Sequence, residues 1–90
     1  MDLVVCLDLV NEVMEEPEGR PVAEPTHDEV EALLDFTRSI AHATERKSAP
    51  VAAYALGLAI GGLGPARRAA LMTAAAMRID EVAAAETRET

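Results

Sequence analysis

The side chains best suited to chemistry lie in one stretch near the middle of the chain. His42 and Glu45 are three residues apart, which places them on the same side of a helix, and Asp35 precedes His42 by about two turns. Imidazole and carboxylate groups can ligate zinc or iron. Two ligands do not make a site, however, and the chain lacks the repeated Glu-x-x-His order of di-metal helical bundles. We therefore predict no metal site and no cofactor, and keep as the alternative function a small-ligand or metal-binding domain with its site at the connection between this helix and the next.

The same stretch can instead form a polar network at the end of a helix. Asp35 is spaced to pair with Arg38, Arg38 with His42, and His42 or Glu45 with Arg46. A solvated helix face explains these pairs without any function. A second interpretation has Glu45 and Arg46 folding back onto the orphan carbonyl groups at the helix end. We take five residues as a candidate ligand- or partner-binding set: Asp35, Arg38, His42, Glu45 and Arg46.

Catalytic fingerprints are not found in the sequence. A nucleophile–base pair of Cys6 and His42 is conceivable, but no third group or glycine-rich turn supports it. The chain contains no P-loop, dinucleotide-binding motif or zinc-finger spacing. Cys6 falls among Leu3, Leu7 and Val10, which predicts a buried structural thiol. These observations favour an interaction or ligand-binding domain over an enzyme, and we predict no catalytic residue.

The charge balance restricts the partners. Sixteen acidic and eight basic residues give a formal net charge of −8, which repels phosphate backbones and disfavours nucleic acid. Arg67 and Arg68 begin a helix and are suited to a phosphate, but two arginines in an acidic protein are more simply explained as surface residues. A helix-turn-helix shape is conceivable, although its first helix would offer only Tyr54 as a polar side chain.

Length and composition predict one all-α domain. Ninety residues allow a single modest core. Half of the residues are hydrophobic but only 2% are aromatic, so the core must consist of alanine and aliphatic side chains. Alanine fills little volume, and the helices must approach closely to leave no voids. Because such a core is marginal alone, we expect a homo-oligomer, most simply a homodimer.

Two helices are expected on either side of a proline-rich loop. Apolar residues repeat at helical spacing from Asp2, a suitable N-cap, to Glu16. Three prolines and a glycine interrupt residues 17–25, which predicts a mobile loop. A Thr26/Glu29 capping box then opens a helix expected to reach Arg46. Its predicted inner stripe is Val30, Leu33, Leu34, Thr37, Ile40, Ala41 and Thr44, and Ser39 falls on the solvent side.

The second half of the chain predicts two further helices. Ser48 is a suitable N-cap for a helix that is apolar all round, and we expect that helix to form the centre of the core. Small residues recur along it at Ala53, Gly57 and Gly61, a ridge that a second backbone can approach closely. Pro65 starts the last helix, expected to end near Ala85 and to be followed by a frayed tail at 86–90. The inner face predicted for this helix is Met72, Ala75, Ala76, Ile79, Val82 and Ala83. Together the elements predict a four-helix antiparallel bundle.

Membrane segments are not expected. The N-terminal apolar run is interrupted by Asp2 and Asp8, which argues against a signal peptide. The uncharged segment from Ser48 to Pro65 is too short to cross a bilayer. We expect a cytoplasmic protein that does not bind membranes.

The centre of the chain resembles a known family. The pattern Ala41-His42-x-x-Glu45-Arg46, followed by Ala49-Pro50 and an apolar helix, is similar to an actinobacterial helical domain of unknown function. That domain is found in, or fused to, proteins of the molybdenum cofactor guanylyltransferase type. The likeness spans about 30–62, with departures at Lys47, where proline is common, and at Val51, where leucine is common.

The resemblance implies an accessory role beside molybdenum cofactor chemistry. It implies a guanylyltransferase-like protein as a partner in the synthesis of molybdopterin guanine dinucleotide. The catalytic enzyme begins with a glycine-rich nucleotide-binding loop that this chain lacks, so the transfer reaction itself is not implied. The first helix also lacks a tryptophan that the family leads us to expect.

Overall fold

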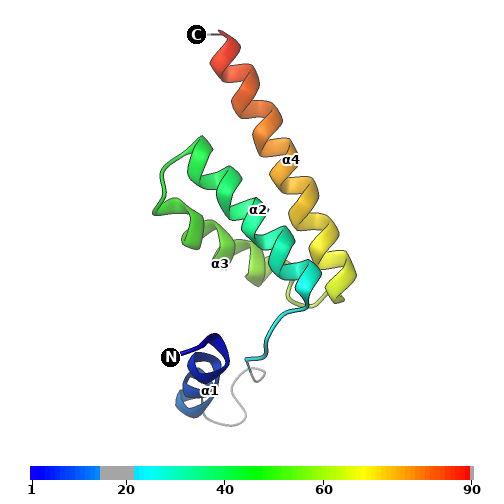
Figure 1. The fold of residues 1–90 in the computed structure, drawn as a ribbon. Helices are drawn as coiled ribbons and strands as arrows, with labels where there is room; N and C mark the ends of the chain where they lie inside the picture. Colours follow the sequence, from blue (N-terminus) through cyan, green and yellow to red (C-terminus); the bar gives the residue numbers. More distant parts are fainter. Residues whose placement is uncertain (15–21, 90) are drawn as a thin grey trace.

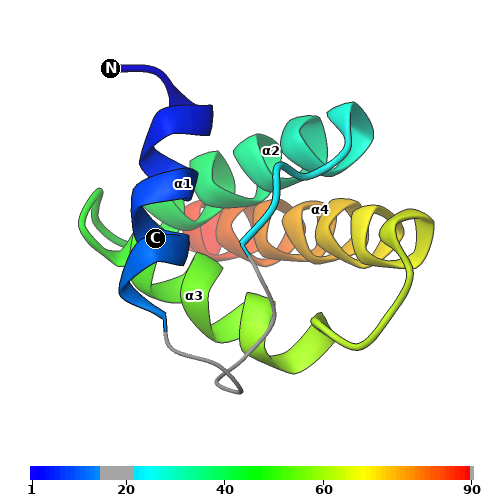
Figure 2. The same cartoon turned by 90° about the horizontal axis from the view of Figure 1, so that it is seen from below.

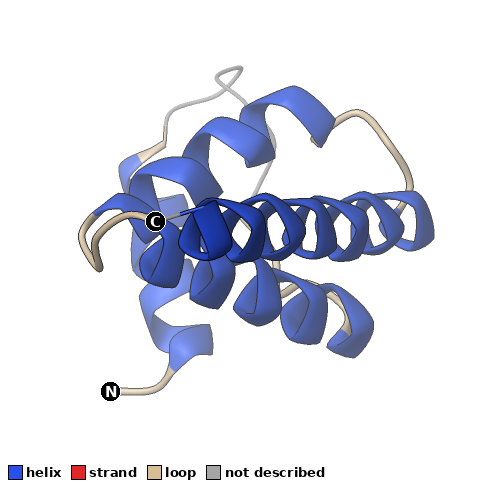
Figure 3. Ribbon diagram, turned by 90° about the horizontal axis from the view of Figure 1, so that it is seen from above, coloured by secondary structure: helices blue, strands red, loops and turns tan. Residues whose placement is uncertain are grey.

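The chain is all-α in the part that the structure describes. The computed structural model describes residues 1–14 and 22–89, which contain four helices and no strand (Figures 1 and 3). The helices are α1 (Leu3–Val13), α2 (His27–Ala43), α3 (Ser48–Ile60) and α4 (Pro65–Glu89). The predicted all-α class is thus confirmed. The loop predicted to be mobile, residues 17–25, lies largely outside the described residues.

Three of the helices pack together and the fourth stands apart. α2 packs against both α3 and α4, and its contact with α4 is the more extensive. α2 and α4 lie side by side and run in the same direction, while α3, which connects them in the chain, runs back in roughly the opposite sense (Figures 1 and 2). α1 contributes no buried residue. The expected four-helix antiparallel bundle is therefore not confirmed, because α1 contributes no buried residue and α2 and α4 run in the same direction.

The helix starts follow the local sequence. Thr26 and Glu29 form the predicted capping box at the start of α2, and the Asp2 carboxylate accepts from the backbone N–H of Val5 at 3.0 Å. At α3 the prediction was wrong, because Ser48 is the first helical residue and its predecessor Lys47 makes no side-chain cap. α2 ends at Ala43, three residues before the expected end.

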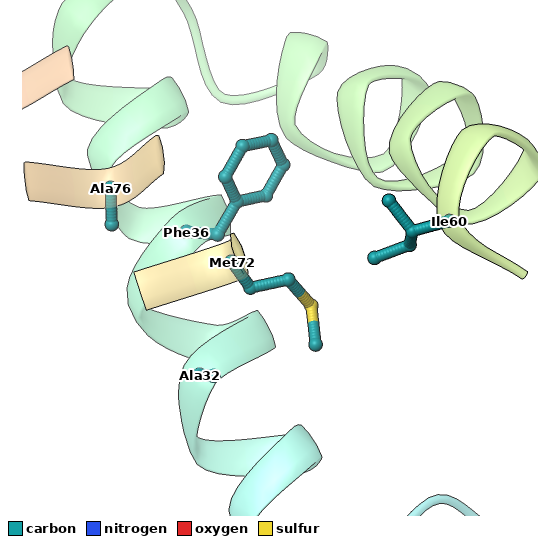
Figure 4. Close-up of a cluster of buried hydrophobic side chains, with 5 residues drawn as sticks. All are labelled: Ala32, Phe36, Ile60, Met72 and Ala76. Carbon is teal, nitrogen blue, oxygen red and sulfur yellow. The ribbon is translucent and has the colours of Figure 1, made fainter. Parts of the chain in front are cut away.

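The core is small and rich in alanine. Its five buried members are Ala32, Phe36, Ile60, Met72 and Ala76. Figure 4 shows Ile60 pointing from α3 toward Phe36 of α2 and Met72 of α4. None of the described side chains is more than 98% buried. The predicted inner face of α4 is largely right, since Met72 and Ala76 are buried, although α4 continues to Glu89 and Val82 is exposed.

The buried face of α2 is rotated from the predicted stripe. Ser39, expected in solvent, is buried, whereas Leu34, expected inside, is 55% exposed. α2 has two neighbours: Ala32 and Ser39 line grooves shared with α4, whereas Leu33 lines a cavity shared with α3. The predicted stripe assumed a single packing partner. Because α2 packs against two helices, the boundaries of its buried face differ from those predicted.

α3 is peripheral, so the prediction that it forms the centre of the core was wrong. Only Ile60 of this helix is buried. Val51, Tyr54 and Leu58 are each about 70% exposed. The central helix is α2, which is amphipathic and can pair two different faces with two neighbours.

The chain exposes much more surface than a compact monomer of its length. Its accessible area is 6914 Å², against about 5,000 Å² expected for a compact chain of this size. Its radius of gyration is 15.3 Å, against about 12 Å expected. The excess of roughly 1,900 Å² exceeds the area of about 800 Å² that each partner buries in a standard protein interface.

Candidate functional site

Part of the predicted polar set gathers in a groove between α2 and α4. Asp35, Arg38 and His42 line this groove, of about 200 Å³, together with Asp80 of α4. The predicted pair of Asp35 and Arg38 is present at 3.0 Å. Asp80 was not singled out from the sequence, since contacts between α2 and α4 are not fixed by local spacing. The groove thus offers one guanidinium, one imidazole and two carboxylates to solvent.

Glu45 and Arg46 lie apart from this groove. Both are exposed in the connection between α2 and α3, where Glu45 Oε1 lies 3.8 Å from Lys47 Nζ. The turn is not closed by the Glu45 and Arg46 side chains folding back onto the carbonyl groups at the helix end, as one interpretation of the sequence had it. The Thr44 hydroxyl donates to the carbonyl of Ile40 at 2.7 Å, and the N–H of Ser48 donates to the carbonyl of Glu45 at 3.0 Å. Backbone groups and one threonine therefore make this turn.

The described residues contain no cluster suited to a metal. No group of three or more His, Cys, Asp or Glu side chains lies close enough to hold an ion within residues 1–14 and 22–89. His27, the second histidine, contacts Glu31 one turn later at 3.1 Å on the exposed side of α2. Cys6 is exposed on α1, so the expectation of a buried thiol was wrong, because α1 has no packing partner to cover it.

A partly buried ion pair joins α2 to α4 and was missed in the sequence. Arg68 Nε lies 2.7 Å from Glu29 Oε2 and Nη2 lies 3.2 Å from Oε1, a bidentate arrangement. Arg68 Nη1 also donates to the carbonyl of Leu63. The two side chains are 27% and 9% exposed. Glu29 was predicted only as a capping residue and Arg68 as a surface residue, because no local pattern links positions 39 residues apart.

The ion pair fixes the protonation state of Glu29. Hydrogen bonding from the Arg68 guanidinium lowers the pKa of the Glu29 carboxyl from its ordinary value of 4.5, while partial burial opposes the shift. Hydrogen bonds from Thr26 lower the pKa of Glu29 further. Glu29 therefore stays ionised and serves both the helix cap and the contact between α2 and α4.

The exposed side of α3 carries an apolar groove. Tyr54, Gly57, Leu58, Gly61 and Gly62 line it together with Val22 and Ala23, and it measures about 930 Å³. α3 contains no charged residue, in a chain with sixteen acidic and eight basic side chains. Exposed apolar surface on this scale is typical of a site of protein association.

α1 adds a second exposed apolar face close to this groove. Six of its large hydrophobic side chains are exposed: Leu3, Val4, Val5, Leu9, Val10 and Val13. The Asn11 amide bonds both backbone groups of Val22, donating to its carbonyl at 2.8 Å and accepting from its N–H at 2.5 Å. Because Val22 itself lines the groove, this contact ties the end of α1 to the wall of the groove. We call the exposed apolar side chains of α1 and α3 the α1/α3 surface.

Three packed helices with an apolar surface left uncovered define a small all-α domain suited to association. The chain belongs to the family described as domain of unknown function DUF6457, whose model matches residues 4–90. No curated protein and no solved structure matches this chain. In the described residues, no helix is both long and apolar enough to cross a membrane.

Proposed function

We propose that this domain is a helical interaction module that forms a homodimer through the α1/α3 surface. The observation that carries the proposal is the exposure of Val51, Tyr54 and Leu58 on a helix without charge. Covering these side chains with a second copy removes apolar area from water, which is the main driving force of association.

Charge favours self-association at this surface over any other. Each copy carries a formal net charge of −8, so two copies repel one another wherever their acidic residues meet. α3 carries no charge and is the part of the domain where two copies approach with the least repulsion. We therefore expect the dimer to strengthen as salt screens the remaining repulsion.

The test is sedimentation equilibrium of the wild type beside two matched variants. Leu58→Glu places a charge on the proposed interface, and Leu34→Glu places the same charge on the exposed side of α2. We expect the wild type and Leu34→Glu to dimerise and Leu58→Glu to remain monomeric with unchanged helical circular dichroism. A monomeric wild type, or equal dimerisation of the two variants, contradicts the proposal.

The accessory role in molybdenum cofactor synthesis is proposed on the resemblance alone. Its partner is a guanylyltransferase-like protein, and its contact is the polar face of α2 with the connection that follows, at His42, Glu45 and Arg46. Isothermal titration of the domain with such an enzyme tests this role, using the His42→Ala/Glu45→Ala double variant as the comparison. Equal heats from both proteins, or no binding by either, contradict it. The cytoplasmic location stays a prediction.

Small-ligand or metal binding at this end of α2 is the alternative function. The observation that favours it is the groove that brings Asp35, Arg38 and His42 together with Asp80. Glu45 and Arg46 do not line this groove. A ligand bound in the groove therefore contacts α2 and α4 and not the connection between α2 and α3. Titration of the His42 ring signals by NMR with divalent zinc and with phosphate tests this alternative, and signals unchanged by both exclude those ligands.

A further inference from the structure

A second cavity lies on the inner side of α3, between that helix, α2 and α4. Its volume is about 310 Å³. Its wall is apolar except for two residues, Glu29 and Arg68. The apolar lining is formed by Pro25, Leu33, Ala53, Leu56, Gly57, Ile60, Gly61 and Met72. A concave apolar site with a few convergent polar groups is the usual form of a small-molecule pocket.

The cavity exists because the small-residue ridge of α3 is not packed. Ala53, Gly57 and Gly61 were expected to let another backbone approach closely. A side chain added at Gly57 would meet nothing within 4 Å, so no backbone occupies that space. Packed interiors leave few voids larger than water, and here a cavity lies directly beside the buried side chains of Met72 and Ile60.

The polar groups at the cavity determine the kind of head group that fits. Three of the five N–H donors of Arg68 have partners in the described part of the chain, two at Glu29 and one at Leu63, which leaves two donors for a ligand. Glu29 Oε2 accepts from Arg68 alone among the described residues and retains capacity to accept from a ligand. The site can therefore both donate to and accept from one small polar group.

The charge at the cavity is already balanced. The Arg68 guanidinium is neutralised by Glu29 at 2.7 Å, so an anionic ligand gains little from Arg68 and is repelled by the Glu29 carboxylate. The net charge of −8 adds to this repulsion. A cationic head group would have to compete with Arg68 for Glu29. A neutral hydroxyl group meets neither penalty and satisfies both the donor and the acceptor.

We propose that the cavity between α2, α3 and α4 binds a small neutral molecule with an apolar body and one hydroxyl group. The apolar body fills the space beside Met72, Ile60 and the Ala53–Gly57–Gly61 ridge. The hydroxyl group accepts from Arg68 and donates to Glu29. The site borders the dimer surface, because Gly57 and Gly61 line both cavities, but the rest of its lining differs from that of the outer groove, where Tyr54 and Leu58 lie.

The test is an NMR titration that follows the methyl group of Met72 with 1-heptanol as the probe. Ala53→Leu fills the cavity, and Ala55→Leu adds the same atoms at an exposed position of α3 that lines neither cavity of this helix. We expect saturable shifts in the wild type and in Ala55→Leu, with affinity reduced by about tenfold or more in Ala53→Leu. Heptanoate is expected to bind about tenfold more weakly than heptanol, because its carboxylate faces Glu29.

Three results would overturn the proposal. The first is a Met72 signal that does not saturate with heptanol, and the second is equal binding by Ala53→Leu and the wild type. The third is a Met72 signal that moves with protein concentration and not with heptanol, which assigns the cavity to a side chain of a second copy. Repeating the titration on Leu58→Glu keeps this test independent of the dimer, since the cavity is expected to bind heptanol equally in the monomer.

Discussion

The interface between α2 and α4 is buried although α2 carries many charged residues. The outer face of α3 is exposed although α3 is almost entirely apolar. α2 carries Asp28, Glu29, Glu31, Asp35 and Arg38, yet it is the central helix. α3 carries no charge, yet three of its large side chains are about 70% exposed. Burial here follows from which helix faces are paired within the chain. The outer face of α3 is left uncovered by the other described helices, and we propose it as the surface for a second copy.

The largest loss of stability is expected when the buried aromatic ring is removed. Phe36 is 5% exposed and is the only phenylalanine in the chain. We expect Phe36→Ala to lower the free energy of unfolding by about 3–5 kcal/mol, through lost burial and the cavity left behind. Urea unfolding followed by circular dichroism at 222 nm measures the change. Leu34→Ala, on the exposed side of the same helix, is the control and is expected to cost much less.

The next largest effect is expected from the ion pair. Arg68→Met leaves the Glu29 carboxylate without its bidentate partner at the contact between α2 and α4. We expect a clear fall in melting temperature, smaller than that of Phe36→Ala. Arg67→Met removes the same group from the neighbouring, exposed position and is expected to change little. Equal melting temperatures for the two variants would show that the pair does not hold the helices together.

The ion pair also predicts how stability depends on pH. The pKa of Glu29 is lower in the folded protein than its ordinary value of 4.5, so folding releases a proton from this group at acidic pH. The stabilisation is complete above pH 4.5 and is lost as the pH falls through the folded pKa. We expect the stability of the wild type to fall more steeply on acidification than that of Arg68→Met. Parallel curves for the two proteins contradict this assignment.

The smallest effect is expected at the contact between α1 and the rest of the chain. Asn11→Ala removes both bonds to the backbone of Val22, one at 2.8 Å and one at 2.5 Å. We expect almost no change in the unfolding of the three packed helices, since α1 buries no residue among them. We expect weaker dimerisation, because α1 is then no longer held beside the α3 groove. Sedimentation equilibrium of this variant at several concentrations separates the two effects.

The sequence predicted the features that depend on local spacing. The Thr26/Glu29 capping box, the start of α4 at Pro65 and the burial of Met72 and Ala76 are all confirmed. Each of these follows from residues within a few turns of one another. The pair of Asp35 and Arg38 is of the same kind, being three residues apart on one helix.

The features that depend on pairing between distant helices were not predictable in this way. An entirely apolar helix such as α3 has no periodic face, so its sequence does not distinguish a core position from an interface. Glu29 and Arg68, and likewise His42 and Asp80, come together only because α2 and α4 lie side by side. The candidate site was thus found in part, with Asp35, Arg38 and His42 in one groove and Glu45 and Arg46 outside it.

The most direct test of the α1/α3 interface uses a probe that the chain already contains. Tyr54 is the only tyrosine, the chain has no tryptophan, and the Tyr54 side chain lies on the proposed interface at 70% exposure. Acrylamide quenching of its fluorescence can be measured over the concentration range in which sedimentation equilibrium follows the mass. We predict that quenching decreases in step with the formation of dimer. A mass that doubles while Tyr54 stays fully quenchable, or a mass that never doubles, would contradict the account.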